Sequence, residues 1–217
     1  MIGVATAVAL PHISFMGILV WPLNILATLI HEGSHGLMAL LTGGSIVSVT
    51  INTDGSGSLS NSGGSRALVL FAGYLGTNVF GFLLLVTAVR VGLSRLILGV
   101  MGTLFILLVV LYGKFGLFTI ASGICAGVFF LLVAYKIESH FAIFISAFLG
   151  ANIVMNAFND LLYLVVASSN GLTESDAGFM SNEFGLPATF WAVLWMGMSL
   201  CFLIFGSYSL ITRVRSA

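Results

Sequence analysis

The sequence predicts an all-α polytopic membrane protein with about six transmembrane helices and a short β-hairpin after the first. Of the 217 residues, 59% are hydrophobic and only 6% are charged, whereas a soluble domain carries roughly 25% charged residues. The apolar residues gather in stretches close to the about 20 residues that a helix needs to cross a bilayer. Backbone polar groups in lipid must pair within the chain, which favours helices over other spanning structures.

The composition also excludes several classes of protein. The chain has too few polar and charged residues for a soluble enzyme, a coiled coil or a disordered protein. The 7 Lys and Arg residues balance 7 Asp and Glu residues, so no basic patch is available for nucleic acid. We therefore expect one transmembrane domain over 1–217, integral and multi-pass, in the cell membrane, with the lipid bilayer as its surroundings. The composition does not bear on the oligomeric state.

Six apolar segments are long enough to span a membrane. They cover about 13–41, 67–89, 93–112, 115–135, 140–167 and 189–211. Pro22 interrupts the first segment, where it either kinks one long helix or begins a second one.

Two connections are longer than tight turns. Between positions 43 and 66, a β-branched run over 46–51 is followed by Asp54-Gly55 and a second short run over 57–59. This pattern predicts a β-hairpin. The other connection, about 167–187, holds acidic residues and no basic residue.

The pattern HExxH lies inside the first apolar segment, as His31, Glu32 and His35. A spacing of four residues places both histidines on one helical face, one turn apart. Two neutral imidazoles so placed can bind one Zn²⁺, and Glu32 is suited to take a proton from water that the metal activates. We therefore predict a zinc site with Glu32 as the catalytic base.

The pattern is specific in a chain with only 4 histidines. From the residue frequencies, HExxH arises by coincidence roughly once in 700 such chains. Ionisable groups at membrane depth are expensive and usually functional. The alternative is that the three side chains only hydrogen-bond neighbouring helices.

A zinc peptidase needs a third protein ligand. Asp160 is the only acidic residue inside another expected span. His35 lies seven residues before Thr42, and Asp160 lies eight residues before Ser168. At 1.5 Å per residue, both side chains are about 10–12 Å from the ends of parallel spans. We therefore predict Asp160 as the third ligand, the alternative being an acid paired with a neighbouring asparagine.

Three asparagines inside the spans are candidates for substrate binding. Asn78 can hydrogen-bond a substrate or a developing oxyanion, and Asn152 and Asn156 can position a substrate backbone or support Asp160. For each of them, a contact between helices is an equal alternative.

These residues resemble the site-2 proteases, which are intramembrane zinc metalloproteases, in the small branch that is little more than the membrane core. The resemblance rests on HExxH in an early helix, on the β-rich stretch after it, on Gly73-Tyr74-Leu75-Gly76-Thr77-Asn78 and on Ser175-Asp176-Ala177. The late span with Asp160 corresponds to the family's third ligand. There Asn152 and Asp160 keep the positions of the motif Asn-x-x-Pro-x-x-x-Leu-Asp-Gly, while three other positions differ.

The resemblance implies a metalloprotease that uses zinc to cleave peptide bonds of transmembrane protein substrates. Two other functions are compatible with the sequence: a proteolytically inactive membrane scaffold or chaperone, and a metal transporter. The membrane orientation has two solutions. The positive-inside rule makes cytoplasmic the face with Arg90, Arg95, Lys136 and the C-terminal arginines, and the resemblance implies the reverse.

Overall fold

The computed structural model describes residues 17–114, 116–168 and 175–216. In its described residues, each of the six apolar segments forms a helix. They are α2 (Gly17–Leu41), α3 (Arg66–Thr87), α4 (Val91–Tyr112), α5 (Leu117–Tyr135), α6 (Ser139–Ser168) and α8 (Ala188–Ser216). Within the described residues, five helices are long and apolar enough to cross a membrane. The remaining long helix, α2, carries the polar HExxH residues. The predicted fold class is confirmed.

The first segment is one continuous helix over its described part. Pro22 lies inside α2, where its missing N–H costs one helical hydrogen bond without ending the helix. From Gly17 onward the segment is therefore one helix, and no second helix begins at Pro22. Residues 13–16 of the expected segment lie outside the described residues.

The predicted hairpin is present. It consists of β1 (Ser45–Ile51) and β2 (Gly57–Ser62), paired antiparallel with Ile51 opposite Gly57 and an irregularity between Ile46 and Ser48. Gly55 in the turn has a φ of 92°, a left-handed conformation that glycine adopts without strain. The Asp-Gly signal thus located the turn correctly.

The second long connection contains a helix that the sequence analysis did not predict, α7 (Asp176–Phe184). The Ser175 hydroxyl caps its first turn by accepting a hydrogen bond from the Gly178 backbone N–H at 3.2 Å. Gly185 ends the helix in the left-handed conformation, as is common at helix C-termini. Both ends of α7 are therefore determined locally.

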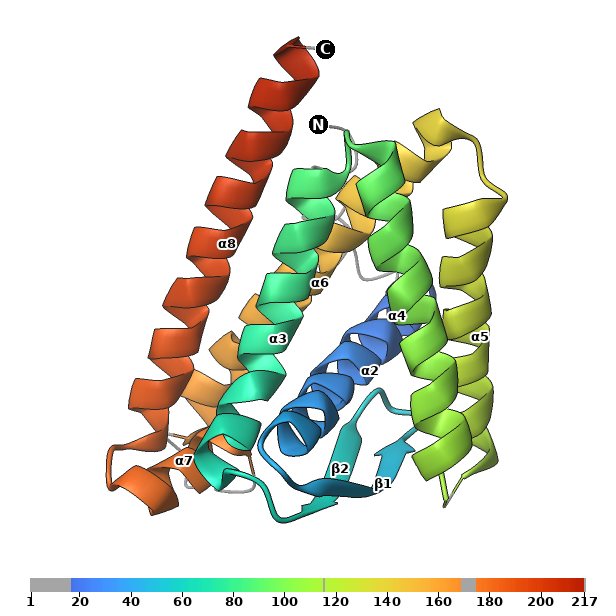
Figure 1. Ribbon diagram of the computed structural model, residues 1–217. Helices are drawn as coiled ribbons and strands as arrows, with labels where there is room; N and C mark the ends of the chain where they lie inside the picture. The colour runs from blue at the N-terminus through green and yellow to red at the C-terminus, as the bar shows by residue number, and fades with distance from the viewer. Residues whose placement is uncertain (1–16, 115, 169–174, 217) are drawn as a thin grey trace.

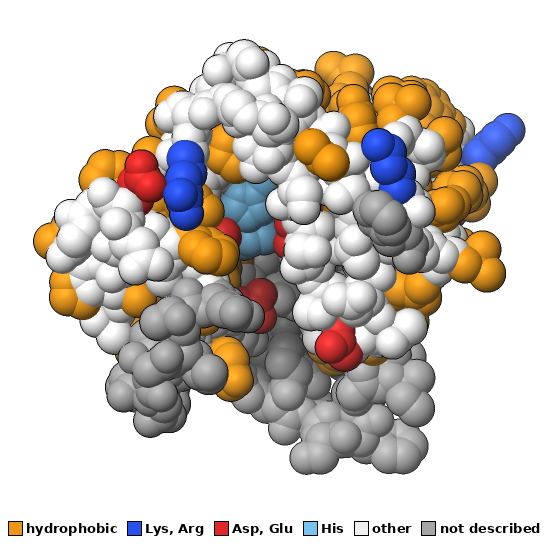
Figure 2. Space-filling model, turned by 90° about the horizontal axis from the view of Figure 1, so that it is seen from below, with side chains coloured by type: hydrophobic (Ala, Val, Ile, Leu, Met, Phe, Trp, Pro, Cys, Tyr) orange, Lys and Arg blue, Asp and Glu red, His pale blue; other side chains and the backbone are white. Residues whose placement is uncertain are grey.

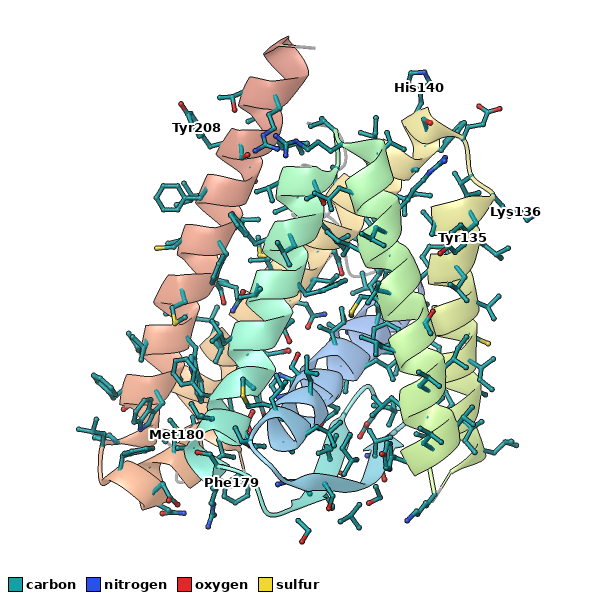
Figure 3. The ribbon with its side chains drawn as sticks, in the orientation of Figure 1. Tyr135, Lys136, His140, Phe179, Met180 and Tyr208 are labelled. Carbon is teal, nitrogen blue, oxygen red and sulfur yellow. The ribbon has the colours of Figure 1, made fainter. Side chains whose placement is uncertain are left out.

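The hairpin and α7 lie at the same end of the helix bundle (Figure 1). Figure 3 shows Phe179 and Met180 of α7 at this end, and Lys136 and His140 at the opposite end. The C-terminal end of α2 also reaches the hairpin end, so HExxH lies between the middle of the bundle and the hairpin.

Glycines let neighbouring helices approach closely. A Cβ atom added to Gly81 of α3 would lie 2.8 Å from the carbonyl oxygen of Gly150 in α6. Gly102 of α4 and Gly127 of α5 face one another in the same way. A Cβ atom added to either glycine would lie 2.7 Å from the carbonyl oxygen of the other. Such backbone contact is typical of helices that associate in lipid, where small residues bring the helices together.

Apolar side chains fill the interior and also cover the outside. One core cluster joins α2, α4, α5 and the hairpin, and a second joins α3, α6, α7 and α8. On the outer faces, large apolar side chains such as Leu96, Val110 and Phe205 remain exposed. With so few charged residues in the chain, these faces suit lipid rather than water.

The Thr119 hydroxyl hydrogen-bonds the hairpin to the helix bundle. Thr119 of α5 is fully buried; its Oγ1 accepts a hydrogen bond from the Ile51 backbone N–H at 3.0 Å and lies 3.2 Å from the Ile51 carbonyl oxygen, to which it donates. This pairing satisfies backbone groups at the end of β1 that would otherwise be buried without a partner.

We predict that Thr119→Val lowers the free energy of unfolding by about 1–3 kcal/mol, because the buried Ile51 N–H loses its acceptor. Thermal unfolding in detergent measures the change. Thr103→Val is the matched control, since the Thr103 hydroxyl bonds only within its own helix. Equal stability of the two variants would contradict this role for Thr119.

Candidate metal centre

Helix α2 presents its two HExxH histidines on one face, as the spacing predicts. The Nε2 atoms of His31 and His35 are 3.0 Å apart. His35 is 7% exposed and Glu32, next to His31, is 6% exposed. The imidazoles meet edge to face, with ring centroids 4.7 Å apart. The two potential ligand atoms thus converge on one point.

Helix α7 supplies a third group to this point. Oδ2 of Asp176 lies 3.0 Å from Nε2 of His31 and 3.2 Å from Nε2 of His35. These three residues form the group of potential metal ligands found among the described residues. Tetrahedral zinc with bonds of about 2.0–2.1 Å separates its ligand atoms by about 3.3–3.4 Å. Two imidazoles and a carboxylate at this spacing fit a zinc ion.

The Asp176 side chain is held as a carboxylate. Burial alone would raise its pKa, but hydrogen bonds with His31 and His35 outweigh burial and keep the pKa well below the usual value for an aspartate. A carboxylate is the form that binds a cation. The Ser175 cap places this residue in the first turn of α7, facing α2.

A backbone carbonyl of α3 selects the tautomer of His35. Nδ1 of His35 lies 2.6 Å from the carbonyl oxygen of Val69. Since a carbonyl can only accept, Nδ1 donates this hydrogen bond, and Nε2, on the side of His31 and Asp176, is the nitrogen left to bind a metal once it has lost its proton. Such a hydrogen bond on the far nitrogen is common for histidines that bind metals.

Helix α3 packs directly on both imidazoles at Gly73. A Cβ atom at this position would lie 2.5 Å from Nε2 of His35 and 2.6 Å from Cε1 of His31. Any side chain there would move the rings, so the glycine is required by the closeness of α3 to the site.

Glu32 faces the hairpin. Its Cγ lies 3.0 Å from the position of a Cβ atom on Gly57, and the Leu59 backbone N–H of β2 donates toward its carboxylate. The glutamate therefore lies beside the three-residue group without belonging to it.

A polar cavity of about 230 Å³ opens beside these groups. Its lining includes His31, Glu32 and Asp160, together with the β2 start at Gly57. Seen from the hairpin end, histidine side chains are visible in the middle of the surface with acidic side chains around them (Figure 2). The site is thus open toward this end of the bundle.

Asp160 reaches the cavity but is not in the group of three. The depth argument for α2 and α6 placed it correctly near His31 and Glu32, whereas the carboxylate grouped with the imidazoles belongs to Asp176. The depth of a residue gives its position along the bundle axis only, not its distance from the histidines. Helix α7 brings Asp176 closer to them than Asp160. Asp160 as a ligand stays a prediction.

The three predicted asparagines lie among the helices, outside the residues that line the cavity. Asn156 donates to Oδ1 of Asn24 at 2.6 Å and so links α6 to α2. Asn78 is 1% exposed and donates to the Tyr74 carbonyl oxygen of its own helix, and Asn152 is 4% exposed. The structure therefore brings none of them to the cavity wall, and their role in substrate binding stays a prediction.

Sequence reasoning missed the position of Asp176. A signal was available, because Ser175 followed by an acidic residue is a typical start of a helix. The segment lies outside the expected spans, among which the third ligand is predicted, and only its resemblance to site-2 proteases points to it.

Most of the chain matches a known protein family. The family described as Peptidase M50B-like matches residues 1–206. The chain belongs to this family. Membership makes it a site-2 protease-like membrane metallopeptidase at the level of the family, and, with five candidate spans, an integral multi-pass membrane protein. No curated protein and no solved structure matches the chain.

We predict that Gly73→Ala lowers zinc affinity at least about 10-fold, since second-sphere changes at metal sites typically cost 10–100-fold. Zinc titration of the purified protein measures the change. Gly92→Ala is the matched control, because a Cβ atom at Gly92 meets nothing within 4 Å. Unchanged affinity in Gly73→Ala would show that α3 does not constrain the two rings.

Proposed function

We propose that this protein is an intramembrane zinc metalloendopeptidase that cleaves peptide bonds of membrane-embedded protein substrates. The observation that supports it best is the convergence of three ligand atoms, 3.0–3.2 Å apart, beside a buried glutamate. Family membership supports the same class of enzyme.

In this proposal His31, His35 and Asp176 hold the zinc ion. When bound, zinc lowers the pKa of water toward about 7 and polarises the carbonyl of the scissile bond. The Val69 carbonyl orients His35, and the carboxylate of Asp176 offsets part of the metal's charge.

Glu32 moves the proton. Its carboxylate accepts a proton from the attacking water and returns it to the leaving amine. The Leu59 N–H of β2 orients this carboxylate, and the low exposure of Glu32 keeps bulk water from competing with it.

The hairpin supports an extended substrate. A transmembrane substrate must unwind locally, because helical carbonyls are shielded by their own hydrogen bonds. Strand β2 runs past Glu32, so a segment that adds to this strand edge would carry its backbone through the cavity. Extended pairing at β2 would thus present a scissile carbonyl next to the base.

We predict that Asp176→Asn loses bound zinc, because a neutral amide replaces the anionic ligand. Asp160→Asn is the matched control in the same cavity and should keep the wild-type zinc content. Metal analysis of the purified variants measures both. Zinc loss in Asp160→Asn with retention in Asp176→Asn would instead make Asp160 the third ligand.

We predict that Glu32→Gln keeps its zinc and loses peptidase activity by at least about 10²-fold, since the amide cannot accept the proton. The assay uses zinc-loaded protein in liposomes with a set of single-span peptides, each carrying a fluorophore and a quencher. Glu138→Gln, the same chemical change at an exposed position between α5 and α6, serves as the control.

The same assay discriminates the alternatives. A scaffold, a chaperone or a metal transporter with this fold does not need the proton acceptor. If wild-type protein cleaves none of the peptides, or Glu32→Gln cleaves them at the wild-type rate, the peptidase proposal is wrong.

A further inference from the structure

Tyr74 of α3 lies against the proposed metal site. It is 9% exposed and lines the polar cavity together with His31 and Glu32. Its ring meets the His31 ring edge to face, with centroids 4.6 Å apart, and stacks on Trp195 of α8 at 5.2 Å. Aromatic contacts on two sides therefore fix the ring in position.

The Tyr74 hydroxyl is free to bind a ligand. Among the hydrogen bonds of the described residues, none engages this hydroxyl. A tyrosine hydroxyl in a buried position usually has a partner. Here the side chain is about nine-tenths buried and is part of the cavity lining.

The other hydroxyls of the cavity wall are already used. Thr28 bonds to the carbonyl oxygens of Asn24 and Gly55. Thr77 donates to the Gly73 carbonyl oxygen of its own helix, and Ser56 donates to the Asp54 carboxylate. Of the side-chain hydroxyls on the described cavity wall, Tyr74 alone has its proton available for a bound molecule.

The Tyr74 side chain is a neutral phenol, the ordinary form of tyrosine near neutral pH. A neutral phenol can donate a hydrogen bond. In the reaction, it is suited to donate to an oxygen atom that gains negative charge.

We propose that the Tyr74 hydroxyl donates a hydrogen bond to the carbonyl oxygen of the scissile peptide and stabilises the negative charge that develops there. The proton stays on the phenol, and no covalent bond to Tyr74 forms. This inference rests on the proposed peptidase function. It makes Tyr74 a catalytic residue in addition to Glu32, placed by α3 and α8 rather than by α2.

Tyr74→Phe tests this proposal, because phenylalanine keeps the ring contacts with His31 and Trp195 and removes only the hydroxyl. We expect kcat in the liposome assay to fall about 10²–10³-fold, as for the loss of one oxyanion donor, with KM, zinc content and thermal unfolding unchanged. Tyr208→Phe is the matched control, since Tyr208 is exposed on α8 toward the opposite end of the bundle (Figure 3).

Several outcomes would overturn the role of Tyr74. Wild-type kcat in Tyr74→Phe would show that the hydroxyl does not act in the reaction, and a raised KM at unchanged kcat would indicate substrate binding only. Loss of zinc would show a structural role. Glu32→Gln in the same assay separates the two proposals: if it is inactive while Tyr74→Phe is normal, only the role of Tyr74 fails.

Discussion

The contact between α2 and α7 is the interaction on which the arrangement of the site depends. Three ionisable side chains meet there within 3.0–3.2 Å, in a protein whose interior is mostly apolar. Charged groups at this depth are costly unless each has a partner of opposite charge. The imidazoles and the Asp176 carboxylate are partners for one another, and a bound cation would be a further partner for the carboxylate.

The surrounding elements are arranged around this contact. Helix α3 provides a carbonyl acceptor at Val69 and close packing at Gly73, which hold the two imidazoles from the side. The hairpin, fastened to α5 through Thr119, brings β2 to Glu32. Segments from most of the chain therefore converge on four side chains of α2 and α7, which explains why so small a protein can bury a polar site.

The local features of the protein were predictable from its sequence. The spans follow from runs of apolar residues, and each run is long enough to decide its own structure as a helix in lipid. The hairpin follows from Asp54-Gly55 between two short strands, and the convergence of His31 and His35 follows from the helical period. Each of these patterns depends on residues that are close in the sequence.

The sequence by itself thus determined a multi-pass helical protein with a paired-histidine motif and an adjacent glutamate. Only the tertiary structure decided which acid meets the histidines. Asp160 and Asp176 are similar candidates in sequence, 129 and 145 positions from His31, and helical depth says nothing of rotation about the bundle axis. The choice of Asp176 depends on how α7 folds back under α2 and α3, a non-local packing that no short pattern encodes. The same packing brings Tyr74 and Trp195 beside His31 and leaves the phenol open to the cavity.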